Sequence, residues 1–169
     1  EQCDDGNVAD GEGCSATCAL KSPEVPETEP NDIQANATPS GLNGTGRVTL
    51  VGANQPSGDD DVYRLRVPAG QSLTLSARTY TQQGQPLSCD RMLTDTRMFV
   101  EPAGTEVTDP SQAGALAYND DIDNAGNVWC SAVSVALTGG AAGTDYFVRI
   151  QGWQDTQTTQ YLLDLELSP

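Results

Sequence analysis

The sequence Glu27-Thr28-Glu29-Pro30-Asn31-Asp32, followed later by Asp59-Asp60-Asp61-Val62-Tyr63, decides how the rest of the chain is interpreted. In an extended segment side chains alternate between two faces, so Glu27, Glu29 and Asn31 project to one side. Asp59 and Asp61 share a face of the second stretch, and this face continues into Tyr63, which indicates a core-facing strand. We therefore expect the two aspartates at the rim of a β-sandwich, where the first stretch can fold over them.

The first stretch supplies oxygen ligands of the kind that bind calcium. In a straight segment Glu27 and Asn31 would lie roughly 13 Å apart at Cα, too far for one ion bound at about 2.3–2.6 Å. A curved segment around one calcium ion and a straighter segment serving two are both open. The alternative without an ion is an acidic, proline-bearing linker followed by a solvated aspartate turn.

The composition excludes several classes of function. Lys and Arg number 8 against 24 Asp and Glu, which gives a net charge of −16, and histidine is absent. This charge repels nucleic acids and anionic membranes, so neither is expected as a partner. The lack of histidine removes Ser-His-Asp and Cys-His catalysis and His-ligated zinc. A glycosidase with two carboxylates stays formally open, but nothing selects one pair, and we expect no enzyme.

Apolar and polar side chains alternate in five stretches, at 47–50, 72–78, 132–137, 146–151 and 161–167, with turn residues between them. A period of two with one apolar face is typical of antiparallel sheets with one buried side. No stretch shows a long helical period. The pattern therefore predicts an all-β, antiparallel sandwich of about eight strands in two sheets.

The five cysteines indicate an oxidising compartment and leave one without a partner. Cys89 and Cys130 are predicted to pair, closing a loop of about forty residues and stabilising the fold by roughly 4 kcal/mol. Residues 1–20 have almost no apolar content, so cross-links must hold them. Two of their three cysteines can pair, and the assignment adopted is Cys3–Cys14 with Cys18 odd. The chain begins without methionine or a signal peptide, and we expect a trimmed product of a secreted precursor.

Several motifs together resemble one known family. E-x-E-P-N-D at 27–32, D-x-D-x-Y at 59–63, V-P-A-G at 67–70, N-D-D at 119–121 and Y-F-V-R-I-x-G at 146–152 resemble the bacterial pre-peptidase C-terminal (PPC) domain, over roughly residues 25–168. The collagen-binding domains of secreted clostridial collagenases belong to the same superfamily. The resemblance implies a jelly-roll-type sandwich, Ca²⁺ between the N-terminal linker and the sheet, and a non-catalytic role beside a secreted enzyme or surface protein.

The resemblance also assigns residues and domains. By position, five residues match calcium ligands of the collagen-binding members, whereas Asp59 departs from their spacing; the matching residues are Glu27, Glu29, Asn31, Asp32 and Asp61. Residues 1–20 resemble the second half of a myxobacterial-type Cys-rich disulfide repeat. The expected organisation is this partial repeat, a linker at 21–28, and a PPC-like sandwich at 29–169.

A second calcium site is suggested at Asn119, Asp120, Asp121 and Asp123, together with Asp95, because members of the resembled family carry an aspartate-threonine pair and a later N-D-D. The stretch is no EF-hand, since alanines stand at 125 and 132, where an EF-hand needs an acid or amide and the bidentate glutamate. An acidic hairpin turn is the open alternative.

Trp153 is a candidate for contact with a glycan or protein, although a tryptophan at this place can also plug the end of a sandwich. The expected function is a secreted, Ca²⁺-binding accessory module at the bacterial surface or outside the cell, which orients or attaches a larger extracellular protein. Its partners would be other domains of that protein or copies of itself. A structural subunit that assembles into an extracellular fibre or surface layer is the alternative, and adhesion to protein or polysaccharide is a third option.

Overall fold

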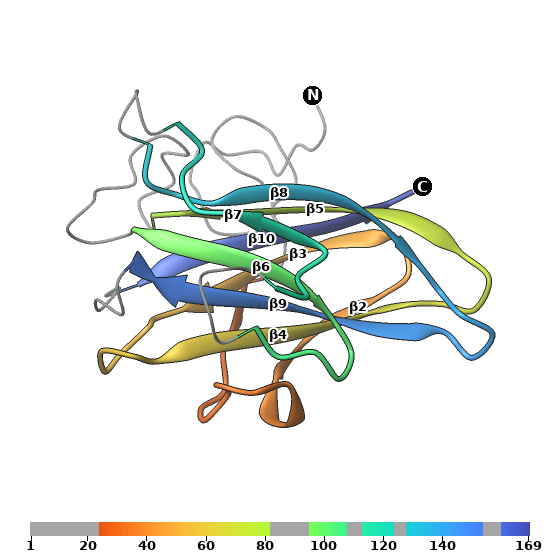
Figure 1. Ribbon diagram of the computed structural model, residues 1–169, viewed down its shortest axis with the longest axis horizontal. Helices are drawn as coiled ribbons and strands as arrows, with labels where there is room; N and C mark the ends of the chain where they lie inside the picture. Colours follow the sequence, from red (N-terminus) through yellow and green to blue (C-terminus); the bar gives the residue numbers. More distant parts are fainter. Residues whose placement is uncertain (1–23, 82–94, 108–112, 124–127, 154–159) are drawn as a thin grey trace, which may run out of the picture.

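The computed structural model describes residues 24–81, 95–107, 113–123, 128–153 and 160–169. These residues form two five-stranded sheets packed face to face (Figure 1). The first sheet has the order β1 (Glu24–Pro26), β3 (Gly46–Gly52), β10 (Tyr161–Ser168), β5 (Ser72–Tyr80) and β8 (Ala132–Thr138). The second has the order β2 (Thr38–Asn43), β4 (Asp60–Val67), β9 (Thr144–Gly152), β6 (Thr96–Pro102) and β7 (Ala117–Asn119). The predicted all-β sandwich is confirmed.

Two strand pairs differ from the antiparallel expectation. β1 pairs with β3 and β2 pairs with β4 in parallel, so both sheets are mixed. The described strands number ten rather than about eight, and the stretches named from the sequence did not include β1, β2, β6 (Thr96–Pro102) or β7. β2 has the sequence T-P-S-G-L-N, in which Pro, Gly and Asn are all depleted in strands. β1 begins within the predicted linker and has only three residues.

The core lies between the sheets and consists of the inward side chains of alternate strand positions. Leu50, Leu65, Leu75, Val148, Leu163 and Leu165 are among its fully buried members. The predicted strand face of Tyr63 is confirmed, since Tyr63, Leu65 and Val67 belong to this cluster. The alternation thus positions Asp61, on the same face of β4, at the end of the core.

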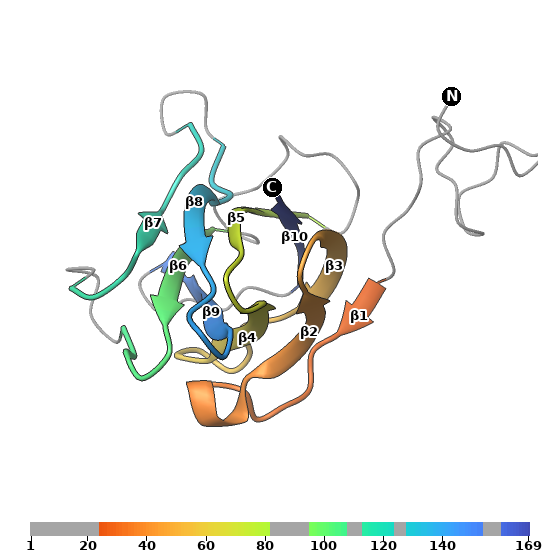
Figure 2. The ribbon, with the colours of Figure 1, turned by 90° about the vertical axis from the view of Figure 1, so that its right-hand side faces the viewer.

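The outer face of the second sheet is also covered. The 3-10 helix η1 (Gln34–Asn36) contacts β4 and lies on the outer side of this sheet (Figure 2). The Gln34 side chain donates to Glu101 Oε2 (2.9 Å) and to the carbonyls of Pro102 (3.2 Å) and Thr105 (2.6 Å). β9 is consequently buried on both faces along most of its length.

Most of the cysteines in the predicted disulfides lie outside the residues that the structure describes. Cys130 is buried and disulfide-bonded. Cys89, Cys3, Cys14 and Cys18 lie outside the described residues, so the pairings Cys89–Cys130 and Cys3–Cys14 stay predictions. The described part of the chain contains no helix with the length and apolar character needed to span a membrane.

Candidate metal centre

The acidic arm, residues 27–32, crosses from the first sheet to the second. Glu27 N donates to the carbonyl of Val51 (3.0 Å), which continues the β1–β3 pairing. Val62 N donates to the carbonyl of Asn31 (3.2 Å), which attaches the end of the arm to β4. The arm is therefore bound to the sandwich at both ends.

Asn31 is a fully buried part of this attachment. With its amide oriented so that both polar atoms are satisfied, the oxygen accepts from Thr38 Oγ1 (3.1 Å), and the nitrogen donates to Glu29 Oε1 (3.1 Å) and the carbonyl of Asp60 (3.2 Å). The side chain that was predicted as a calcium ligand thus holds the arm against β2 and β4. Its backbone N–H also donates to Glu29 Oε2 (3.0 Å).

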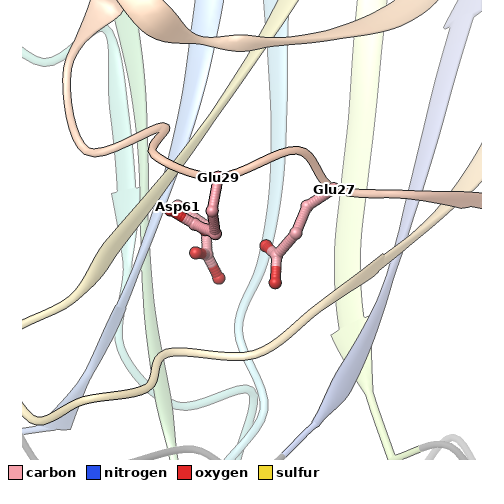
Figure 3. A group of neighbouring side chains, drawn as sticks. All are labelled: Glu27, Glu29 and Asp61. Atoms are coloured by element: carbon pink, nitrogen blue, oxygen red, sulfur yellow. The ribbon is translucent and has the colours of Figure 1, made fainter.

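The arm and β4 bring the predicted carboxylates together. One oxygen from each of Glu27, Glu29 and Asp61 lies within 4.8 Å of the others, and the same holds for Glu29, Asp32 and Asp59. Figure 3 shows Glu27 and Glu29 extending from the arm on the same side as Asp61 of β4. Because Glu29 belongs to both groups, the five carboxylates form one continuous cluster.

Asp61 is the buried centre of this cluster, with an exposed fraction of 0%. Its Oδ2 accepts hydrogen bonds from Tyr161 Oη and from Asn54 Nδ2, whereas its Oδ1 has no hydrogen-bond partner. Burial, and then the charge of Glu27, raise the pKa of Asp61 to about 9. A carboxylate oxygen without a donor inside the protein is unfavourable unless a cation or a proton compensates it.

The other acids of the cluster are held with their oxygens in defined positions. Glu27 Oε1 accepts from Ala53 N (2.8 Å) and Oε2 from Tyr63 Oη (3.0 Å). Burial raises the pKa of Glu27 as well. Asp59 Oδ2 accepts from Gln55 N (2.7 Å), and burial raises the pKa of Asp59 to about 6 in spite of this bond.

Tyr63 and Tyr161 form the floor below Glu27 and Asp61, and their hydroxyl oxygens lie 2.9 Å apart. Both side chains are fully buried. A Cβ at Gly52 would lie 2.3 Å from Tyr63 Oη and 2.5 Å from Tyr161 Oη, so only glycine allows the two rings to occupy this floor. Sequence reasoning missed Asn54 and Tyr161, because neither lies in an acidic stretch.

The donor set fits a hard divalent cation. All the clustered ligand atoms are carboxylate oxygens, and the described part of the cluster contains neither thiolate nor imidazole, the donors that softer metals prefer. Calcium takes six to eight oxygens in flexible geometry, and the carboxylates that the arm and β4 bring together supply oxygens of this kind. The buried, unpartnered Oδ1 of Asp61 is the observation that favours an ion over a solvated acidic turn.

A second set of contacts attaches the arm on the opposite face of β4. Arg149, with an exposed fraction of 1%, donates through Nε to Glu101 Oε1 (2.7 Å), through Nη1 to Asp60 Oδ2 (2.9 Å) and through Nη2 to Glu106 Oε2 (3.0 Å). Nη1 also donates to the carbonyl of Asp32 (2.8 Å). Asp60 and Asp61 therefore serve two different networks from adjacent positions of one strand.

The second predicted site comes together in part. One oxygen from each of Asp95, Asp120 and Asp121 lies within 4.8 Å of the others. Asp120 Oδ1 is buried without a hydrogen-bond partner, and burial and then the charge of Asp121 raise the pKa of Asp120. Asp123 instead pairs with Val128 through backbone hydrogen bonds.

Asn119 and Trp153 have structural contacts near this second group. Asn119 Oδ1 accepts from Ala132 N (2.9 Å), and its Nδ2 donates to the carbonyl of Asp121 (3.1 Å). Trp153 is half-buried. Its backbone N–H donates to the carbonyl of Asp95 (2.9 Å), and the Arg97 guanidinium lies 5.8 Å from the centre of the indole ring. A second calcium site and a ligand contact at Trp153 stay predictions.

Comparison with known proteins gives likeness in structure only. No family model matches the sequence, and no curated protein matches it. Among solved structures, the chain is similar to a periplasmic inhibitor of g-type lysozyme from Aeromonas hydrophila, with 16% identity over 88% of this chain and 98% of that chain and a TM-score of 0.46. It is also similar to the pre-peptidase C-terminal domain of a collagenase from Bacillus anthracis, with 10% identity over 89% of this chain and 99% of that chain and a TM-score of 0.43. Neither likeness assigns a family, so the PPC resemblance stays an expectation that rests on the sequence motifs.

Proposed function

We propose that this chain is a non-catalytic, extracellular β-sandwich module in which Ca²⁺ fastens the acidic arm to β4. The observation that supports the proposal is the fully buried Asp61, whose unpartnered Oδ1 lies in a cluster with Glu27 and Glu29. A divalent cation at this point would compensate the buried charge and bind both the arm and the strand. The arm would then hold one fixed position between the first sheet and the second.

The two overlapping groups of acids set the number of ions that can bind. Glu27, Glu29 and Asp61 would hold one ion, and Glu29, Asp32 and Asp59 would hold a second, with Glu29 shared between them. Each ion offsets two of the 16 net negative charges of the chain. Both groups combine residues of the arm with residues of β4 or of the turn before it, so either ion would fasten the same segment.

The proposed consequence is mechanical. The arm directly follows β1, the first described strand, so an arm fixed by Ca²⁺ would help to hold β1 against β3 and to orient the module relative to whatever precedes it in a larger secreted protein. Extracellular modules bind calcium with Kd of about 10⁻⁴–10⁻³ M, and millimolar calcium would then add about 1–2 kcal/mol per site to the free energy of unfolding.

Isothermal titration with Ca²⁺ and thermal melts with and without chelator test the proposal. The wild-type protein is expected to give a saturable heat signal on titration and to melt at a higher temperature in 5 mM Ca²⁺. The matched control is Glu166→Gln, which removes an exposed acid of β10 outside the cluster and is expected to keep the full response. A wild-type protein whose melting temperature is the same in Ca²⁺ and in chelator would contradict the proposal.

Self-assembly is the second candidate, and one observation favours it. β8, Ala132–Thr138, is an edge strand of the first sheet and has the uncharged sequence A-V-S-V-A-L-T. A long edge strand without charges can pair with a strand of another copy. Filaments in negative stain that disappear on Ser134→Lys would favour assembly, whereas a monomer at high protein concentration would count against it.

A further inference from the structure

A groove lies between β2 and β4, away from the acidic cluster. Pro39 pairs with Arg64 and Asn43 pairs with Arg66, so β2 advances four residues where β4 advances two. This irregularity contains Gly41, which has a φ of +81°. A cavity of about 330 Å³ opens at this bulge, within the range of pockets that hold small ligands.

The groove contains a guanidinium that the protein does not neutralise. Arg64 is exposed and lines the cavity, and its side chain makes no hydrogen bond or ion pair within the part of the chain that the structure describes. Arg47 is paired with Asp164, and Arg149 with three carboxylates. The one acid that lines the cavity, Asp145, is paired with Arg66, and an arginine side chain without an acidic partner is unusual in a chain with 24 acids and 8 bases.

The second arginine of the groove, Arg66, is neutralised by an ion pair with Asp145. Arg66 Nη1 donates to Asp145 Oδ1 (2.6 Å) and Nη2 to the carbonyl of Ala142 (2.6 Å). The cavity is therefore left with about one uncompensated positive charge, that of Arg64. A polyanion such as a sulfated glycan would be repelled by Asp145 and by the net charge of −16.

The lining matches one carboxylate attached to an apolar group. A guanidinium forms two parallel hydrogen bonds with a carboxylate. Pro39 and Leu42 give the cavity an apolar wall, and the Asn43 amide can bind a peptide group. Because β2 is an edge strand, the groove lies at the edge of the second sheet, and the rest of a bound peptide could extend from it into solvent.

We propose that this groove binds the C-terminal carboxylate of a peptide, with Arg64 as its anchor and Pro39 and Leu42 against the last side chain. The bulge interrupts the regular β2–β4 register, so recognition would rest on the chain end rather than on the addition of a strand. The site is independent of cation binding, since none of the clustered acids lines the cavity.

NMR titration of the ¹⁵N-labelled full chain in a fixed 2 mM Ca²⁺ tests the proposal. The probes are acetyl-Ala-Leu with a free carboxylate, the same dipeptide as its C-terminal amide, and propionate. The free-acid dipeptide is expected to shift the Arg64 Nε–H and the amides of residues 41–43 saturably. The amide and propionate are each expected to bind at least about tenfold more weakly, since the first lacks the charge-assisted bonds and the second lacks the peptide group and the side chain.

Variants separate the anchor from a general charge effect. Arg64→Gln is expected to weaken dipeptide binding by about tenfold or more, and Arg64→Lys by less, because lysine keeps the charge but not the planar pair of donors. Arg47→Gln is the matched control and is expected to bind like the wild type. Equal binding of the acid and the amide, equal binding of propionate and the dipeptide, an Arg64→Gln protein that binds normally, or no shifts at 10 mM dipeptide would each overturn the proposal.

Discussion

Replacing Asp61 with asparagine is expected to stabilise the calcium-free protein and to weaken its response to calcium. Burial and the charge of Glu27 raise the pKa of this carboxyl from the ordinary value of 3.8 to about 9. At pH 7 the folded protein holds the carboxyl protonated, whereas the unfolded chain leaves it ionised. The difference of about 3 pH units, at 1.36 kcal/mol each, corresponds to roughly 4 kcal/mol of lost folding free energy.

Asparagine removes this cost and keeps the shape of the side chain. Its Oδ1 can accept from Tyr161 Oη and Asn54 Nδ2, as Asp61 Oδ2 does, and its Nδ2 can donate to the Glu27 carboxylate. Burying the amide costs part of the gain. We expect a net stabilisation of about 2 kcal/mol, or a rise in Tm of about 4–8 °C for a domain of this size.

The assay is scanning calorimetry at pH 7 in 5 mM Ca²⁺ and in chelator, on the wild type, Asp61→Asn and the control Glu166→Gln. The wild type and the control should both gain stability from calcium. Asp61→Asn should melt above the wild type in chelator and gain less stability from calcium than the wild type does. The variant loses the central anionic ligand of the first group, whereas Glu29, Asp32 and Asp59 keep their carboxylates. An Asp61→Asn protein that melts at or below the wild-type temperature in chelator, or that gains as much stability from calcium as the wild type, would refute the reasoning.

Three further outcomes follow from the same structure. In chelator, the free energy of unfolding should fall as pH rises from about 4 to 9, because across this window Asp61, with its raised pKa, is protonated in the folded state and ionised in the unfolded chain. Urea melts at pH 5 and pH 8 measure this slope, and a flat profile would contradict it. Gly52→Ala should destabilise the protein by about 2 kcal/mol or more, since its Cβ would clash with the tyrosine floor; Gly140→Ala, whose Cβ has 3.5 Å of room, should not, and equal losses in the two would be evidence against the clash. Arg149→Met should cost about 3–5 kcal/mol in denaturant melts by leaving Glu101 buried and unpaired; the double variant with Glu101→Gln should recover part of it, and no recovery would show that the pair is not the cause.

The strands that face solvent on one side were predictable from the sequence. β5 and β10 alternate clearly, because the outer face of the first sheet is polar. β6 and β9 are buried on both faces, because η1 and the segment after β6 cover the outer face of the second sheet. β9 was nevertheless predicted, because Arg149 and Gln151 keep the alternation visible, whereas β6 was not. Strand direction could not be predicted, because a period of two is the same in parallel and antiparallel pairs. The two parallel pairings therefore needed the structure.

The part of the candidate site that depends on the alternation of side chains along extended segments was predictable from the sequence. Glu27, Glu29 and Asp61 meet because the arm and β4 each present alternate residues to the same point. The partners of these acids were not predictable, since Tyr161 comes from the last strand and contacts Asp61 only through the sheet packing. Arg149 faces outward from its strand, as its parity indicates, but the arm folds over it and buries it.

The three consecutive aspartates 59–61, of which the last two begin β4, do not by themselves determine which side chains of the strand face the core. A shift of β4 by one position would still present one aspartate to each face, so Asp60 and Asp61 could exchange places with little change in charge. Tyr63 prevents the exchange, because its large ring fits only between the sheets and its hydroxyl contacts Glu27 and Tyr161. An uncharged, aromatic residue thus determines which carboxylate enters the interior.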